Sequence, residues 1–211
     1  GLIGRLVLEQ LAGIKGNLVT ALVRKPLGLT AGNVREVVFA FDDASCARLG
    51  TSDLTCDGLI CAIGTTMKAA GSAKAFLAVD RDIPMKLIER VNALPHRPPF
   101  ALVSSAGAHR ATGLYLKTKH DVEASLIASG LAATIVRPSL LLGDRREFRL
   151  GERLAMATVP PVFEVLSLVT GGKNAFVETY RPVPAARVAS VLIGAMTDPT
   201  SGCHIVEGAA L

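Results

Sequence analysis

The 211-residue sequence contains no Trp, only two Tyr and seven Phe, and few charged residues. Aromatic side chains make up 4% of the chain and charged ones 19%, while 50% of the residues are hydrophobic. This low charge and high hydrophobic content exclude an intrinsically disordered chain. Because aromatics are so scarce, the core must consist mainly of Ala, Val, Leu and Ile, which suits parallel strands covered by helices on both faces.

Long apolar runs and dense charge clusters are also absent. No stretch of 18 apolar residues occurs, and Glu164 interrupts the longest candidate at residues 159–169, so we predict no membrane span. The formal net charge is +5, but the basic residues are scattered and few aromatics lie between them. We therefore predict no nucleic-acid partner.

The four cysteines show no pattern typical of a metal site. Cys46, Cys56, Cys61 and Cys203 have no Cys-x-x-Cys spacing and no companion His pattern, so we predict no zinc or other metal. The sequence shows no secretory leader, and we expect a protein of the reducing cytoplasm.

Helix-like and strand-like segments alternate along the chain, which is typical of a doubly wound, mostly parallel α/β sheet. We expect strands at residues 17–23, 34–41, 58–63, 100–103, 133–136 and 204–206, and helices at 2–11, 72–93 with a break at Pro84, 113–129 and 185–196. We interpret residues 1–211 as a single domain. Its irregular C-terminal part, residues 140–211, is expected to face the substrate and to contain a helix near residues 162–169.

A tyrosine and a lysine at positions i and i+4, Tyr115 and Lys119, share one face of the predicted helix 113–129. Lys117 and His120 point elsewhere on this helix, and Asp121 and Glu123 are expected to continue their solvated face. An ammonium beside a phenol stabilises the phenolate and makes proton transfer easier near neutral pH. The serine pair at 104–105 ends the preceding strand and could hold a carbonyl against the phenol. This trio fits hydride transfer between a nicotinamide and a carbonyl or alcohol. The alternatives are a chance helical spacing and serines that only cap a turn.

The chain opens Gly1-Leu2-Ile3-Gly4 and continues directly into an apolar helix. Gly1 and Gly4 match the second and third glycines of a Gly-x-x-Gly-x-x-Gly turn, whose backbone approaches a pyrophosphate at a helix N-terminus. The first glycine and the strand before it are absent, so we expect a few residues upstream. Without that strand, two neighbouring strands would be unpaired on their inner edges. The alternative for the two glycines is a frayed N-terminus.

Two further strand ends are candidates for cofactor contacts. The strand 17–23 ends in Arg24 and Lys25 with no acidic residue. A basic residue at this position accommodates a 2′-phosphate, so we predict NADP in preference to NAD; an exposed charge pair is the alternative. The small residues Ala62, Ile63 and Gly64 end another strand and leave room for ribose and phosphate, although an ordinary turn would look the same.

In their order and spacing, these segments resemble the short-chain dehydrogenase/reductase superfamily, and within it the atypical group related to the Tat-interacting oxidoreductase-like protein. The resemblance rests on residues 1–5, 23–25, 61–66, 79–82, 102–106, 115–119, 136–139 and 142–145.

The resemblance implies a role for each matching residue in an NAD(P)H-binding, Rossmann-like fold. Tyr115 matches the proton donor, Lys119 the residue that supports this tyrosine and binds the nicotinamide ribose, and Ser105, with Ser104 as its rival, the group that polarises the carbonyl. The remaining matches are to cofactor contacts: residues 1–4 to the pyrophosphate, residues 24–25 to the 2′-phosphate, residues 62–64 to the adenosine and ribose, and Pro138 to the nicotinamide.

The sequence therefore predicts an NADP(H)-dependent oxidoreductase that reduces a small carbonyl or quinone-like substrate through Ser105, Tyr115 and Lys119. Two alternatives remain open. Because fold does not fix function, the chain is alternatively a catalytically idle NADP(H)-binding regulator or redox sensor. A nucleotide-sugar epimerase or dehydratase would use the same trio. From the resemblance we also expect a homodimer.

Overall fold

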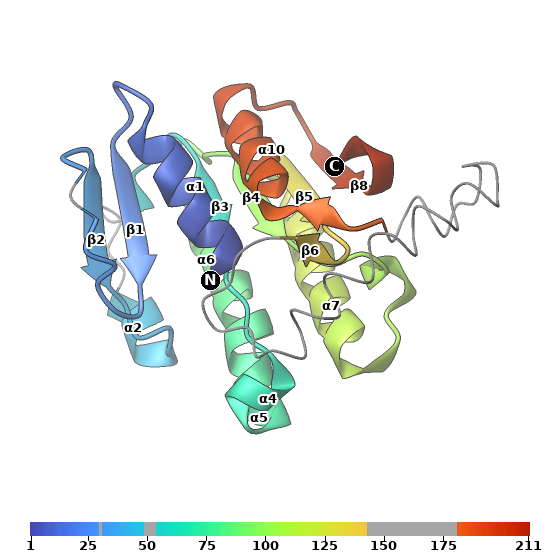
Figure 1. The fold of residues 1–211 in the computed structure, drawn as a ribbon. Helices are drawn as coiled ribbons and strands as arrows, with labels where there is room; N and C mark the ends of the chain where they lie inside the picture. Colours follow the sequence, from blue (N-terminus) through green and yellow to red (C-terminus); the bar gives the residue numbers. More distant parts are fainter. Residues whose placement is uncertain (30, 49–53, 143–180) are drawn as a thin grey trace.

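The computed structural model describes residues 1–29, 31–48, 54–142 and 181–211, and every strand pair among them is parallel. Four strands form the main sheet in the order β3 (Leu59–Cys61), β4 (Phe100–Val103), β5 (Ala133–Arg137) and β8 (Cys203–Glu207) (Figure 1). Two smaller pairs join β1 (Val19–Val23) to β2 (Val34–Val38), and β6 (Leu141–Leu142) to β7 (Val183–Pro184).

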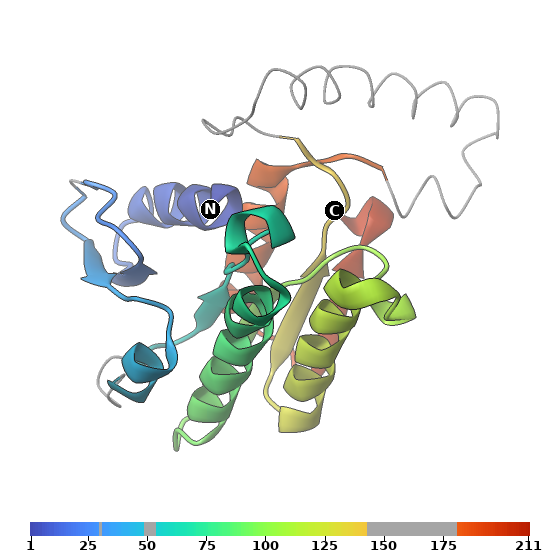
Figure 2. The ribbon, with the colours of Figure 1, turned by 90° about the horizontal axis from the view of Figure 1, so that it is seen from below.

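Helices cover both faces of the strands. On one face α1 (Leu2–Ala12) packs against α10 (Ala185–Thr197), and on the other face α7 (Gly113–Ser129) packs against α6 (Ile83–Asn92) and α6 against α2 (Asp43–Arg48) (Figures 1 and 2). This arrangement confirms the predicted doubly wound α/β fold. The short helices α2 and α4 (Met67–Ala70) were not predicted.

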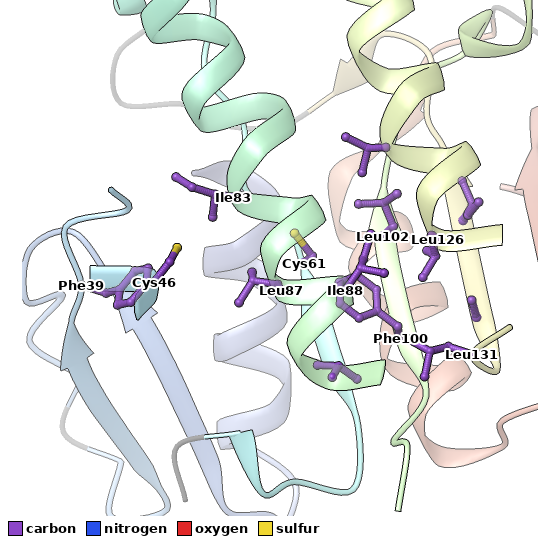
Figure 3. Close-up of a cluster of buried hydrophobic side chains, with 14 residues drawn as sticks. Phe39, Cys46, Cys61, Ile83, Leu87, Ile88, Phe100, Leu102, Leu126 and Leu131 are labelled. Atoms are coloured by element: carbon purple, nitrogen blue, oxygen red, sulfur yellow. The ribbon is translucent and has the colours of Figure 1, made fainter. Parts of the chain in front are cut away.

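Side chains of the central strands divide between two cores, because successive residues of a strand point to opposite faces. In β4, Phe100 and Leu102 join the core under α6 and α7 (Figure 3), whereas Ala101 joins the core under α1 and α10. Both faces of β4 are thus buried. A strand buried in this way suits an aliphatic sequence with few charges.

The helix predicted over residues 72–93 is interrupted before Pro84. Helix α5 (Ala73–Leu77) is followed by a π-helical turn, η1 (Ala78–Asp82), and α6 begins at Ile83. Proline lacks an amide hydrogen and is tolerated in the first turn of a helix, so the break lies on the N-terminal side of Pro84. Asp80, within the π turn, is only 1% exposed.

Strands β1 and β3 do not pair with each other. Within the described residues β1 pairs only with β2, and β3 pairs only with β4. The edges of β1 and β3 that face each other therefore have no ladder partner among these residues. This agrees with the expectation that, without the strand before the first glycine, two neighbouring strands are unpaired on their inner edges. Residues 143–180, with the helix expected near 162–169, lie outside the described part of the chain. No helix within that part has both the length and the hydrophobicity needed to span a bilayer.

Candidate functional site

The predicted site residues gather where the parallel strands end. Residues 62–64 follow β3, the serine pair 104–105 follows β4, Pro138 follows β5, and residues 24–25 follow β1. Helix α1 begins at the same end of the molecule (Figure 1). The carboxyl ends of the strands are where open α/β sheets bind their ligands.

Helix α1 starts without a side-chain cap. Its N-cap residue is Gly1, which has no side chain that could accept a hydrogen bond from the first-turn amides. A Cβ on Gly1 would meet no atom within 4 Å, and a Cβ on Gly4 would lie 3.8 Å from the Cβ of Ala62, so the first turn of α1 lies beside the end of β3. Uncapped amides at the positive end of a helix dipole favour an anion.

Arg24 and Lys25 are exposed, and neither forms an ion pair with another described residue. The acid nearest in sequence, Glu36, has both carboxylate oxygens occupied by backbone amides, accepting from Leu27 N–H at 2.9 Å and from Leu29 N–H at 3.3 Å. The two cations are therefore available to an anionic ligand. Together with the uncapped start of α1, they fit the phosphates of a dinucleotide.

Tyr115 and Lys119 lie one turn apart near the start of α7. The tyrosine is 43% exposed, whereas Lys119 is buried, with its Nζ 5.8 Å from the centre of the tyrosine ring. Phe76 also packs near this ring, with 6.1 Å between the ring centres. The ring of Tyr115 thus has a cation and an aromatic neighbour on the protein side, and a free surface toward solvent.

The hydrogen bond of Lys119 goes to Asp80, which sequence analysis did not identify as a site residue. Lys119 Nζ donates to Asp80 Oδ1 at 2.8 Å, and Thr65 N–H donates to Asp80 Oδ2 at 2.7 Å. The two side chains of the ion pair are 9% and 1% exposed. Asp80 lies in the stretch 79–82 that supported the family resemblance, but its spacing gives no sign that it contacts α7.

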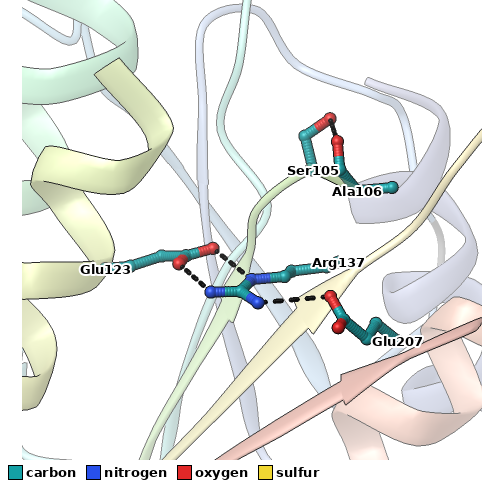
Figure 4. Close-up of polar contacts among 5 residues, drawn as sticks. All are labelled: Ser105, Ala106, Glu123, Arg137 and Glu207. Atoms are coloured by element: carbon teal, nitrogen blue, oxygen red, sulfur yellow. Dashed lines mark hydrogen bonds and ion pairs between the residues drawn. The ribbon is translucent and has the colours of Figure 1, made fainter. Parts of the chain in front are cut away.

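The two serines after β4 lie in different surroundings. Ser104 is 5% exposed, and its Oγ has no hydrogen-bond partner among the described residues. It lines a crevice, too narrow for a water molecule, together with Asp80 and Lys119. Ser105 is half-buried and donates a long hydrogen bond of 3.5 Å to the carbonyl of Ala106 (Figure 4). The structure therefore brings Ser104 to Lys119 and leaves Ser105 outside that crevice.

Pro138, the predicted nicotinamide neighbour, is buried where β5 ends. Its carbonyl accepts a hydrogen bond from Ala106 N–H at 2.9 Å, which ties the loops after β4 and β5 together. Gly64, by contrast, is exposed, and a Cβ on it would lie 3.5 Å from Asp80 Oδ1 and 3.8 Å from Lys119 Nζ. The loop after β3 therefore lies directly against the buried ion pair.

Arg137 of β5 connects α7 to the sheet (Figure 4). Its Nε and Nη2 donate to the two carboxylate oxygens of Glu123 at 2.9 and 2.6 Å, and its Nη1 donates to Glu207 Oε2 at 3.2 Å. The hydrogen bonds to Glu123 raise the pKa of Arg137, despite the opposing effect of burial. The expectation that Glu123 continues an exposed polar face was wrong, since this residue is 2% exposed and turned toward Arg137.

All four cysteines are free thiols. Burial raises the pKa of Cys61 to about 11, and burial also raises the pKa values of Cys56 and Cys203. Within the described residues, no three His, Cys, Asp or Glu side chains converge as metal ligands would.

Comparison with known proteins gives relatives over most of the chain. A family model described as NAD(P)H-binding matches residues 1–157. Protein HTATIP2 of Rattus norvegicus is 41% identical over 97 residues, which are 45% of this chain and 39% of that protein. Protein FMP52-1, mitochondrial, of Scheffersomyces stipitis is 30% identical over 148 residues, 69% of this chain and 65% of that protein. The chain spans about two fifths to two thirds of the length of these curated relatives.

Solved structures share the fold at low sequence identity. The enzyme WbmF of Bordetella bronchiseptica, in complex with NAD+, superposes with a TM-score of 0.70 and 17% identity, over 98% of this chain and 70% of that one. A putative NAD-dependent epimerase/dehydratase of Bacillus halodurans superposes with a TM-score of 0.66 and 19% identity, over 97% of this chain and 87% of that one. At these identities the similarity concerns the fold alone.

Proposed function

The chain belongs to the NAD(P)H-binding family, and on this premise we propose that it is an NADP(H)-dependent oxidoreductase of the short-chain dehydrogenase/reductase type. Its substrate would be a small carbonyl or quinone-like molecule. The observation that carries the proposal is the Tyr115–Lys119 pair at the strand-end edge of the sheet, with the lysine amine 5.8 Å from the centre of an exposed tyrosine ring.

The residues that would hold the cofactor lie along the same edge. The backbone of residues 1–4 would bind the pyrophosphate, because these residues begin α1 and a helix N-terminus directs its amides toward an anion. Arg24 and Lys25 would bind the 2′-phosphate that distinguishes NADP from NAD. Residues 62–64 and Pro138 would line the ribose and the nicotinamide.

The chemistry assigned to this chain is proton transfer. A bound nicotinamide supplies the hydride that reduces the carbonyl carbon. The Tyr115 hydroxyl donates its proton to the oxygen that becomes negatively charged, and Ser105, with Ser104 as its rival, hydrogen-bonds the same oxygen. The Lys119 ammonium stabilises the phenolate that remains on Tyr115 after the proton has left.

The test of this function is NADPH consumption across a panel of quinones, aldehydes, ketones and nucleotide sugars. Replacing Tyr115 by Phe removes only the transferable proton, so turnover should fall by about 10²–10⁴-fold. NADPH binding, measured by thermal shift, should remain. Lys119→Met should also lower turnover. Its matched control is Lys117→Met, because Lys117 is exposed and pairs with Asp121 on the surface of the same helix. A Tyr115→Phe variant with wild-type turnover would refute the assigned mechanism.

Cofactor preference has a separate test. A ligand that binds only the folded state raises the melting temperature by linkage, so NADPH should produce a larger shift than NADH at equal concentration. Replacing Arg24 and Lys25 by Ala should reduce the NADPH shift and leave the NADH shift unchanged. Equal shifts for the two cofactors in the wild-type protein would contradict the assignment of the 2′-phosphate site.

A second candidate function is an NADP(H)-binding regulator without turnover. One observation favours it: the Tyr115 hydroxyl forms no hydrogen bond with any other described residue. Such a protein would bind NADPH tightly and present a surface ordered by the cofactor. Tight NADPH binding with no turnover of any panel substrate would favour this candidate over the reductase.

We propose a reducing compartment, because all four cysteines are free thiols. The cytoplasm is our expectation. The fungal relatives carry the word mitochondrial in their names, which makes the mitochondrion the competing location. Microscopy of the tagged full-length protein in its own host distinguishes the two.

A further inference from the structure

We propose that Asp80 is a positioning residue of this site. Its carboxylate holds the Lys119 ammonium beside the Tyr115 ring, so that cofactor binding and proton transfer depend on a residue outside the Ser/Tyr/Lys set. The catalytic part of this inference rests on the proposed function. The structural part, that Asp80 fixes Lys119, does not.

The carboxylate of Asp80 is held at both of its oxygens. Oδ1 accepts from Lys119 Nζ at 2.8 Å and Oδ2 accepts from Thr65 N–H at 2.7 Å. These two donors belong to different segments, α7 and the loop after β3, so the carboxylate is fixed at two points. A buried carboxylate and a buried ammonium are each stable only when paired, and this ion pair joins three segments that all contribute to the site.

The two aspartates of the π-helical turn η1, Asp80 and Asp82, differ in burial. Asp80 is 1% exposed, whereas the side chains of Arg81 and Asp82 are each 37% exposed and pair with one another at 2.8 Å. Turns of this kind inside α-helices occur frequently at functional sites. Two aspartates of the same turn thus have different surroundings, and Asp82 provides a matched control for Asp80.

The surroundings of the ion pair indicate that it serves a ligand and not packing alone. Gly64, which is exposed, is the residue whose added Cβ would lie within 4 Å of both Asp80 Oδ1 and Lys119 Nζ. The buried Ser104 hydroxyl, unpartnered among the described residues, lines the same crevice. An ammonium has three N–H donors, and Asp80 accepts from one of them. The Ser104 hydroxyl and the Lys119 ammonium therefore lie close together with hydrogen-bonding capacity to spare. The loop after β3 covers them, and it has no side chain at Gly64.

Asp80 also affects the charge that Tyr115 experiences. The carboxylate keeps the Lys119 ammonium at the Tyr115 ring, 5.8 Å from its centre. Asp80→Asn would remove that hold, so the ammonium would no longer be fixed beside Tyr115 and proton transfer should slow. An ion pair that served packing alone would change the stability of the fold but not the turnover of the folded protein.

The first experiment measures whether Asp80 fixes Lys119, independently of any activity. Lysines are acetylated with a water-soluble ester and quantified peptide by peptide, with Lys117, whose side chain is 64% exposed, as the internal reference. We expect Lys119 to react about tenfold more slowly than Lys117, because it must first be released from the interior. In Asp80→Asn the rate at Lys119 should rise about fivefold or more, and in Asp82→Asn it should stay unchanged. An unchanged Lys119 rate in Asp80→Asn would overturn the proposal.

The second experiment measures NADPH binding and turnover of the same variants. Asp80→Asn should weaken NADPH binding about tenfold, and where turnover is found kcat should fall about tenfold or more. Asp82→Asn should change neither. Absence of turnover in the wild-type protein refutes the proposed function, while labelling and NADPH binding still decide the role of Asp80. Wild-type NADPH affinity in Asp80→Asn would refute the positioning role even if Lys119 were released.

An Asp80→Glu variant covers the case in which Asp80→Asn does not fold. It keeps the charge and lengthens the side chain by one methylene, so Lys119 should stay protected from acetylation while its amine is displaced. Weakened NADPH binding with Lys119 still protected supports the proposal. Unchanged NADPH binding in this variant, or the loss of Lys119 protection, contradicts it.

Discussion

Removal of the Glu123 carboxylate should be among the most destabilising single substitutions in α7. Glu123 accepts from two nitrogens of the Arg137 guanidinium, at 2.9 and 2.6 Å, and the two side chains are 2% and 9% exposed. In Glu123→Ala the guanidinium would remain charged, because hydrogen bonding to Glu123 only raises an already high pKa. It would then be a buried cation that has lost its main partner.

The expected size of the effect follows from burial. Breaking a buried pair by removing one partner typically costs about 3–5 kcal/mol. Glu207 provides the matched control, because it contacts the same arginine through a single 3.2 Å bond and its side chain is 36% exposed. Solvent screens that contact, so we expect Glu207→Ala to cost about 1 kcal/mol or less. Lys117→Ala, which breaks an exposed i,i+4 pair on the same helix, should cost about 0.5 kcal/mol or less.

The assay is urea unfolding followed by far-UV circular dichroism. The unfolding midpoint should fall furthest for Glu123→Ala, with little change in the slope of the transition, since the surface exposed on unfolding is nearly the same. Glu123→Gln should retain part of the stability, because the amide oxygen still accepts one hydrogen bond. Equal losses in Glu123→Ala and Glu207→Ala would show that burial does not set the strength of these ion pairs.

Three further predictions concern the fold. Gly130 ends α7 with φ = 66°, so Gly130→Ala should cost about 1 kcal/mol in thermal unfolding, whereas Gly13→Ala, at the end of α1 with φ = −78°, should be neutral. A Cβ on Gly58 would lie 2.6 Å from the sulfur of Met196, so Gly58→Ala should destabilise the fold by about 1–2 kcal/mol, and less in a Met196→Ala background. Because burial raises the pKa of Cys61 from 9.0 to about 11, the folded state retains a proton that the unfolded state loses. Stability should therefore fall by about 2–3 kcal/mol as pH rises through this range, and the slope should be shallower in Cys61→Ala. An identical slope would refute this assignment.

Local features were predicted well because their causes lie close together in the sequence. Helix α7 runs from Gly113 to Ser129 as expected, since Gly130 adopts the left-handed conformation that ends a helix. Strand β4 lies at residues 100–103 as expected, and because successive residues of a strand point to opposite faces, Phe100 and Leu102 join one core and Ala101 the other. The order of strands and helices likewise indicated a parallel sheet and the edge at which its ligand site would lie.

Part of the candidate site could also be predicted from the sequence. Tyr115 and Lys119 were identified because helical periodicity alone puts positions i and i+4 on one face. The choice between the serines at 104 and 105 could not be made in this way. It depends on which hydroxyl the end of β4 turns toward α7, and the structure turns Ser104 into the crevice lined by Lys119.

The sequence by itself determined the class of fold, the ends of its main helices and the pair of residues expected to move a proton. Only the tertiary structure decided the partners of the buried charges. Asp80 meets Lys119 across 39 positions of sequence, and Arg137 meets Glu207 across 70. Periodicity reports which face of an element a residue occupies, but a buried charge takes its partner from whichever segment packs against that face. Three-dimensional packing therefore decides the partner, because a charge buried away from water is stable only beside an opposite charge.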